Sequence, residues 1–252
     1  MRSISLATVF LFFAIQTPPV PAGTVIPIML RSGLNAEKEK VGKRLTGRVM
    51  QDIPLPDGEK IKEGSTIRGH VVSVNKRGPS GSAIVLQFDA IEDGKRTIPI
   101  AASLLAAASM ADVAAAQTPI DSASNIEPTS QWVTRQVGGD IVNRGRGKVA
   151  TAKGAIVGKW LQGSGVVIKL TPNPEAGCPI GPGYDRDQAA WIFSSSACGL
   201  YGLNNMKIQN SGSTQSIGVI ALASTKKVDV RSGSGWLLMV VAAAPQTEPE
   251  KQ

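Results

Sequence analysis

Histidine is almost missing from this chain, which has one histidine and two cysteines in 252 residues. A Ser-His-Asp or Cys-His nucleophile needs a histidine base, and a zinc site needs three or four His, Cys or carboxylate ligands. The histidine, His70, lies in an apolar segment typical of a strand, and no GxSxG motif surrounds any serine. We therefore expect a half-exposed strand residue at His70, no enzyme of these classes, no metal and no other cofactor.

Long apolar runs are also missing, because none approaches the roughly twenty residues that a membrane-spanning helix needs. The apolar run from Ile4 to Ile15 follows the positive charge of Arg2 and precedes Val20-Pro21-Ala22. This layout predicts a signal peptide over residues 1–22. An uncleaved helical anchor is the alternative. Export would place the protein in the periplasm or cell envelope, or outside the cell.

The two cysteines, Cys178 and Cys198, both lie in the second half of the chain. An even number of cysteines in an exported chain predicts a disulfide. Their spacing is not CxxC, which argues against a redox-active pair. We expect a structural disulfide.

Aromatic residues are few, at 4% of the chain, whereas glycine and proline are frequent. Short Val- and Ile-rich runs between Gly, Pro, Asn and Asp predict an all-β fold. We expect a barrel-like domain over 23–102 and a disulfide-stapled, sandwich-like domain over 131–242. Between them, 103–130 forms an Ala-rich linker whose composition favours helix. A disordered tail follows at 243–252.

Positive charge exceeds negative charge, with 27 Lys and Arg against 19 Asp and Glu. Export argues against nucleic acid as the partner. A basic exported surface suits acidic glycans, or anionic lipid headgroups through peripheral membrane contact. The alternative is a solvated surface that has no specific partner.

Glycine alternates with basic residues in the segment Asn143-Arg144-Gly145-Arg146-Gly147-Lys148. Arg144, Arg146 and Lys148 are candidate ligands for phosphate or an acidic glycan, since arginine presents a fork of donors. The alternative is a basic hairpin tip. The four tryptophans suit sugar stacking if they are exposed and a core if they are packed: Trp132, Trp160, Trp191 and Trp236.

Two carboxylates, Asp185 and Asp187, flank Arg186 in a Gly- and Pro-rich segment. Carboxylate oxygens can bind calcium, and a carboxylate pair can act as the general acid and base of a glycoside hydrolase. The alternative is a solvated loop in which the aspartates pair with Arg186.

Three strings in the first domain carry a family resemblance: PAGTVIPIML, VMQDIPLPDGEKIKEGSTIRGHVV and SAIVLQFDAIEDGKRTIPI. They resemble the periplasmic β domain of TrbI-like proteins, the envelope-spanning channel subunits of type IV secretion. The shared features fall on Pro21 to Thr24, Gly64 to Gly69 and Ile84 to Gly94, and the resemblance covers about a third of the chain. It implies a periplasmic β fold. The second domain resembles uncharacterised exported bacterial proteins.

Together these features predict a non-enzymatic exported protein of the bacterial envelope that has a structural, assembly or docking role. Its partners would be other envelope proteins. One alternative is a binder of carbohydrate or of an anionic surface polymer, which would use the arginines near Arg144 and exposed tryptophans. The other is a carboxylate-dependent hydrolase that uses Asp185 and Asp187.

Overall fold

The computed structural model describes residues 20–78, 81–120, 132–145, 147–161, 165–209 and 218–241. Most of the expected signal peptide, the expected tail at 243–252 and Arg146 lie outside the described residues, as does 121–131 of the expected linker. No helix within the described ranges is long and apolar enough to cross a membrane.

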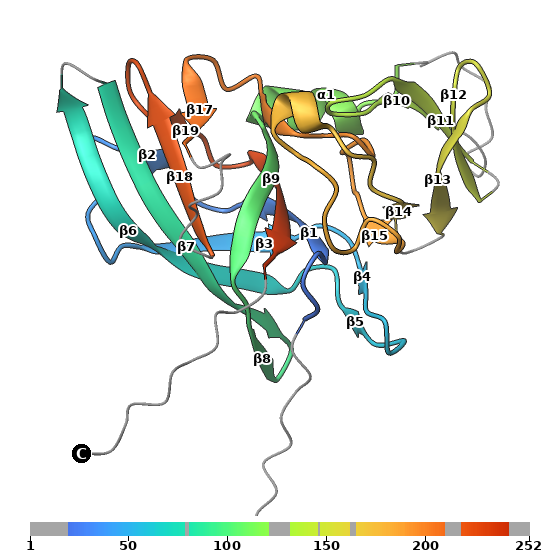
Figure 1. Cartoon of the computed structure of the whole chain (residues 1–252), viewed down its shortest axis with the longest axis horizontal. Helices are drawn as coiled ribbons and strands as arrows, with labels where there is room; N and C mark the ends of the chain where they lie inside the picture. The colour runs from blue at the N-terminus through green and yellow to red at the C-terminus, as the bar shows by residue number, and fades with distance from the viewer. Residues whose placement is uncertain are drawn as a thin grey trace, which may run out of the picture.

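A ten-stranded sheet forms the larger part of the molecule (Figure 1). Its order is β16-β9-β20-β1-β3-β6-β7-β18-β17, and β8 pairs with β7 beside this path. The first and last strands of the order, β16 and β17, contact each other, so the sheet curls into a nearly closed barrel. Its strands are β1 (Val25–Leu30), β3 (Arg44–Val49), β6 (Thr66–Gly78), β7 (Gly81–Asp93), β8 (Arg96–Pro99), β9 (Ala102–Ala108), β16 (Gly199–Tyr201), β17 (Met206–Ile208), β18 (Val219–Ser224) and β20 (Gly235–Val240).

A six-stranded antiparallel sheet is inserted in the chain between β9 and β16, and we call it the inserted sheet. In order it contains β10 (Trp132–Arg135), β11 (Ile141–Gly145), β12 (Lys148–Thr151), β13 (Ile156–Leu161), β14 (Gly165–Ile168) and β15 (Gln188–Ala189). Figure 1 shows it on the far side of the barrel from the β6–β7 hairpin. Two small pairs, β2 (Leu34–Asn35) with β19 (Asp229–Val230) and β4 (Ile53–Pro54) with β5 (Lys60–Ile61), complete the strands.

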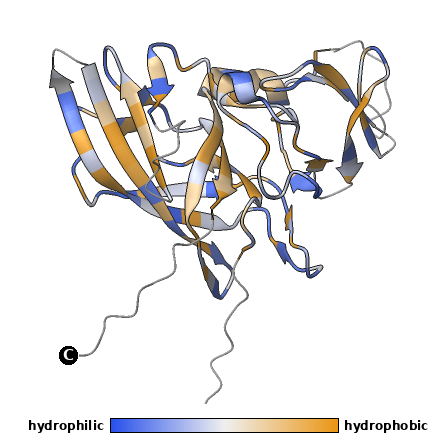
Figure 2. Cartoon of the chain, viewed as in Figure 1, coloured by the Kyte–Doolittle hydropathy of each residue, from blue (hydrophilic) through white to orange (hydrophobic). Residues whose placement is uncertain are grey.

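Strand β1 contributes to two hydrophobic cores because its side chains alternate between the faces of the sheet. Ile26 and Ile28 point into the barrel, where Trp236 packs edge to face against Phe88 with ring centroids 6.2 Å apart. Val25 belongs to the second core, between the barrel wall and the inserted sheet. Apolar residues therefore cover both faces of this wall, and Figure 2 shows the hydrophobic colour along the barrel strands.

The all-β fold class is confirmed, but the expected division at 103–130 does not separate two sheets. β18 pairs with β7, and β20 pairs with β1, so strands from both halves of the chain build the barrel. The insertion, not the whole second half, forms the separate sheet. Sequence patterns identify strands locally, whereas pairing between distant strands depends on tertiary contacts.

The Ala-rich segment differs in part from the expected helical linker. Residues Ala102–Ala108 form strand β9, which lies between β20 and β16, and only Met110–Gln117 forms helix α1. Ser109 caps the helix by accepting a hydrogen bond from the Asp112 backbone N–H. Alanine is small enough to be buried on both faces of β9, so tertiary packing overrides its helix propensity there.

The expected disulfide is confirmed, since Cys178 and Cys198 are bonded to each other. The bridge ties a turn after η1 (Pro174–Ala176) to the segment that leads into β16. It therefore fastens the last part of the insertion to the point where the chain re-enters the barrel.

Candidate functional site

Arg144 occupies a core-facing position in β11. In the register of the inserted sheet it lies opposite Val149 of β12, and Val142 shares its face two residues earlier. Both valines are fully buried in the second core. The sheet therefore points one arginine toward the apolar junction with the barrel.

The guanidinium of Arg144 has no partner for two of its nitrogens. Among the residues that the structure describes, Nε and Nη2 have no hydrogen-bond partner and are shielded from solvent, and the same holds for the hydroxyl Oγ1 of Thr134 on neighbouring β10. Burial lowers the pKa of Arg144 to about 10, so the side chain remains a cation at neutral pH. A buried charge without a partner costs free energy, which makes this arginine unusual for a purely structural residue.

A cavity of about 200 Å³ opens beside this arginine. The inserted sheet contributes Thr134, Arg144 and Trp160, and Trp191 follows β15. We call this cavity the Arg144 pocket. Its walls combine a cation and a hydroxyl with two indole rings, a mixture typical of small-molecule sites.

The opposite wall of the Arg144 pocket belongs to the barrel side of the junction. Met50 and Gln51 follow β3, Glu63 precedes β6, and Gln117 ends helix α1. The carboxylate of Glu63 is 48% exposed and lies 3.6 Å from Arg48. No ion pair joins Glu63 to Arg144 within the described ranges, so the carboxylate of Glu63 does not neutralise the charge of Arg144.

Two buried glutamines fix the position of the inserted sheet on the barrel. Gln51 donates from Nε2 to the carbonyl of Val166 at 2.7 Å and accepts from the Trp191 N–H at 2.8 Å. Gln188 donates to the carbonyls of Gly23 and Gly183 and accepts from the Val25 N–H. Gln51 thereby gives the buried Trp191 N–H its partner, and Gln188 does the same for the Val25 N–H.

Trp191 is held in an unusual backbone conformation, with φ of 50°. This left-handed region is uncommon for a residue other than glycine and persists only where surrounding contacts impose it. Here the bond to Gln51 and an edge-to-face contact with Phe193, at 6.4 Å between centroids, supply those contacts. The indole wall of the pocket is therefore preorganised.

The two described basic residues of the run, Arg144 and Lys148, do not lie in the same environment. The register pairs Gly145 with Lys148, which places the run at the β11–β12 turn, as the hairpin alternative predicts. Lys148 is exposed, whereas Arg144 points inward. Arg146 lies outside the part of the chain that the structure describes. The structure thus places Arg144 beside two tryptophans, whereas Lys148 is exposed to solvent.

The two aspartates lie away from this pocket. Asp187 forms an ion pair of 3.0 Å with Lys159, and Asp185 is exposed. Arg186 pairs with neither and instead donates to the Ala22 carbonyl at 2.9 Å. Among the described residues, no three His, Cys, Asp or Glu side chains are grouped as a metal site would need.

Other sequence-predicted residues lie where their patterns placed them. His70 is 38% exposed on β6 and contacts Asp89 through Nδ1 at 2.8 Å. Trp236 is fully buried and Trp191 is nearly so, as the core reading predicts, but Trp160 is half-buried and lines the pocket. The side chain of Trp132 is outside the described set.

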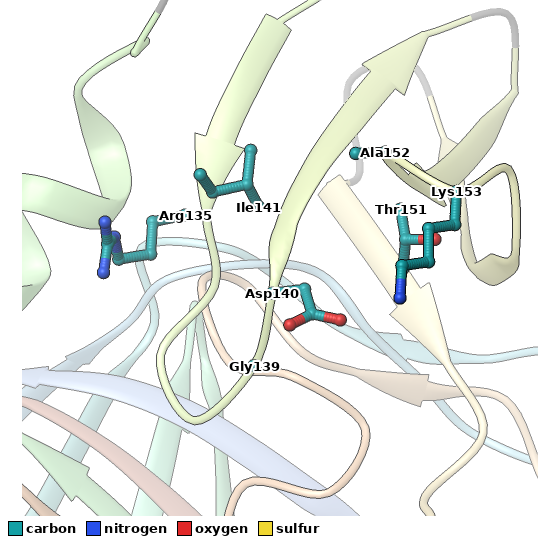
Figure 3. A pocket seen from close by; sticks show the side chains of 7 residues that line it. All are labelled: Arg135, Gly139, Asp140, Ile141, Thr151, Ala152 and Lys153. Atoms are coloured by element: carbon teal, nitrogen blue, oxygen red, sulfur yellow. The ribbon is translucent and has the colours of Figure 1, made fainter.

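A second hollow of about 410 Å³ lies between two hairpin turns of the inserted sheet (Figure 3). Its charged groups are Arg135, Asp140 and Lys153. In Figure 3 Arg135 points away from the other two, and no ion pair joins Asp140 to either cation in the described structure. The hollow has no buried polar group without a partner, so the Arg144 pocket is the stronger candidate.

The sequence signal for the pocket is an alternation that is easily overlooked. In Ile141-Val142-Asn143-Arg144, the period of two places the arginine on the same face as a buried valine. Gln51, Glu63 and Thr134 carry no such signal, because they approach Arg144 only through tertiary packing. Neither family models nor curated proteins gave any match to this chain, so its own residues are the basis for a functional conclusion.

Proposed function

We propose that this protein is a non-enzymatic, exported component of the bacterial envelope that docks an anionic group in the Arg144 pocket. The observation that carries this proposal is the buried guanidinium, whose Nε and Nη2 have no hydrogen-bond partner. An anion that enters the pocket would gain charge-assisted hydrogen bonds, which are about twice as strong as neutral ones.

Binding in the Arg144 pocket removes water from the anion more than from the arginine. Folding has already removed most of the Arg144 side chain from water, so the larger part of the desolvation on binding concerns the anion. At low effective dielectric its attraction to the guanidinium is stronger than the same contact on an exposed surface. A preorganised pocket therefore supports binding that exposed Lys148 cannot provide.

Three features support a place in the envelope. A disulfide between Cys178 and Cys198 is compatible with an oxidising compartment. Residues 1–22 have the pattern of an export signal. The formal charge of +8 favours approach to anionic envelope polymers.

The test is retention of the purified protein on an immobilised acidic polysaccharide at increasing salt, with an uncharged polysaccharide as the blank. We expect Arg144→Met to elute at clearly lower salt than the parent. Lys148→Met removes one exposed cation from the same hairpin and is the matched control. Equal elution of the two variants would contradict a role for the pocket.

A second candidate role is assembly with other envelope proteins through the barrel. The three strings that resemble TrbI-like proteins include β1, β6 and β7, which lie in one contiguous part of the sheet through β3. Strand β8, which lies in the third string, pairs with β7 alone among the described strands, and an unpaired strand edge can dock a partner. Crosslinking in the native envelope tests this role: a large assembly supports it, and a free monomer contradicts it.

The hydrolase alternative receives no support from the geometry of its two residues. Asp187 forms an ion pair with Lys159, and Asp185, two residues earlier in the sequence, is exposed to solvent. A general acid of this kind needs an environment that raises its pKa. We therefore do not propose this activity.

A further inference from the structure

We infer that the Arg144 pocket recognises a carboxylate carried on a sugar ring, the chemistry of a uronic acid unit. This inference rests on the proposed function and specifies the ligand of the same site. It is carried by the orientation of the free donors, the indole walls, the size of the cavity and its balance of charge.

The free donors of Arg144 fit a planar carboxylate. Nε and Nη2 lie on the same edge of the guanidinium, and both are buried without a partner. Their N–H groups run parallel, so they can each donate to one oxygen of the same carboxylate once the Arg144 side chain turns to expose them to the cavity, because neither nitrogen is accessible to solvent in the ligand-free pocket. Thr134 Oγ1 is a further hydroxyl without a partner in the same pocket.

The remaining walls suit a ring that has both polar and apolar faces. Half-buried Trp160 offers indole surface beside the nearly buried Trp191, while the exposed amide of Gln117 offers donors and an acceptor. A sugar ring shows C–H groups on its faces and hydroxyls around its edge. Stacking on indole and hydrogen bonds at the edge would be made together, as in most small-molecule sites.

The volume limits the ligand to about one ring. At about 30 Å³ for each water molecule, the cavity holds about seven waters, which is close to the size of a single sugar unit that is partly outside. A continuous polymer would need a groove. The pocket therefore fits a terminal or branching unit of an acidic polysaccharide.

The charge balance favours a carboxylate over a phosphate. Arg144 is the only cation among the described residues that line the cavity, and Glu63 is the only acid. A carboxylate carries one negative charge, which one guanidinium neutralises. A phosphate monoester carries a charge of about −1.5 to −2 at neutral pH. One guanidinium would not neutralise this charge, and the remainder would be repelled by the carboxylate of Glu63.

The experiment is calorimetric titration of the full chain with three probes that share a ring: glucuronate, glucose and glucose 6-phosphate. We expect glucuronate to bind at least about tenfold more tightly than either of the others, because only it can form the paired charge-assisted bonds without excess charge. Glucose 6-phosphate binding as tightly as glucuronate would overturn the inference.

Variants test the two parts of the pocket separately. Arg144→Lys keeps the charge but removes the fork, and we expect it to lose about tenfold in glucuronate affinity. Trp160→Ala removes the stacking surface, and we expect it to weaken glucuronate binding. Trp160→Phe keeps an aromatic ring, and we expect it to weaken that binding less. An alanine variant that fails to fold leaves Thr134→Val as the second test, with weaker binding expected. Unchanged affinity in both Arg144→Lys and Thr134→Val would overturn the inference.

The results also separate this inference from the proposed function. Arg144-dependent retention on acidic polysaccharide without glucuronate binding, but with glucose 6-phosphate binding, rejects the uronate and keeps an anion-docking role. A parent protein that shows neither retention on acidic polysaccharide nor binding of any probe rejects both the inference and the proposed function. Retention that persists in Arg144→Met rejects the pocket for either purpose.

Discussion

The backbone N–H of Trp191 donates to Oε1 of Gln51 at 2.8 Å, across the junction between the barrel and the inserted sheet. These residues are 140 positions apart in the sequence. The bond fixes the loop after β15 against the end of β3, and it forms one side of the Arg144 pocket. The stability of the junction and the shape of the pocket are therefore linked.

Replacing Gln51 with Met should destabilise the protein by about 2 to 3 kcal/mol, because the buried Trp191 N–H would lose its partner. Val166 would be less affected, since its carbonyl also accepts from the Ala190 N–H at 3.0 Å. Urea unfolding measures this loss. Gln117→Met, at an exposed position of α1, is the matched control, and equal effects in the two variants would refute the structural role of Gln51.

Replacing Arg144 with Met should stabilise the ligand-free protein by about 1 to 3 kcal/mol, because an unpaired buried charge is removed. Burial also lowers the pKa of Arg144 to about 10, because the charged form loses hydration that no partner replaces. Lys148→Met should change the unfolding free energy by no more than about 0.5 kcal/mol. A destabilised Arg144→Met would show that the arginine has a structural partner.

The same pKa predicts a pH dependence with a definite sign. From about pH 10 up to the higher, ordinary pKa of arginine, the unfolded chain keeps the Arg144 proton that the folded protein has released. Stability rises with pH wherever the unfolded state binds more protons, so this group adds a rising contribution across that window. The difference between the parent and Arg144→Met should shrink there. A constant difference from pH 8 to pH 12 would contradict the lowered pKa.

Replacing Gly23 with Ala should weaken the attachment of the inserted sheet. A Cβ at Gly23 would lie 1.9 Å from the carbonyl oxygen of Pro182, and the residue has a φ of +79°. Gly58 has a similar φ of +83° but open space around it, which makes Gly58→Ala the control for backbone strain alone. We expect Gly23→Ala to cost at least about 2 kcal/mol more than Gly58→Ala. Thermal unfolding would measure both, and similar costs would argue against close packing of the Pro182 loop on β1.

Removing the disulfide with Cys178→Ser and Cys198→Ser should cost about 3 kcal/mol in the chain-entropy model. The bridge closes a loop with a sequence separation of 20 residues within the last part of the insertion. Because the bridge lies outside the barrel strands, we expect hydrogen exchange to quicken around η1 and β16 while β6 and β7 stay protected. Uniform loss of protection would show that the bridge supports the whole fold.

The sequence predicts local structure well where a pattern is complete within a few residues. The alternation of Ile84, Leu86 and Phe88 is typical of a strand and Gly94 is typical of a turn, and this pattern agrees with β7 and its hairpin with β8. The cysteine pair likewise correctly predicts the bridge. Each of these features depends on neighbouring residues or on compartment chemistry.

The pairing of distant strands could not be predicted in the same way. Nothing local in Gly235–Val240 indicates that it pairs with Val25–Leu30, or that Ala102–Ala108 is a buried strand instead of a helix. The candidate site was predicted only in part, through Arg144. Its tryptophan, threonine and glutamine neighbours come from elements that meet only after the inserted sheet packs on the barrel.

The most direct test of the central claim follows the Arg144 side chain itself. The Nε–H signal of Arg144 in a nitrogen-15 NMR spectrum is identified as the one missing from Arg144→Met. On titration with glucuronate we predict that this signal shifts in a saturable way, while glucose leaves it in place. An Arg144 signal that does not move at saturating glucuronate would contradict carboxylate binding in the pocket.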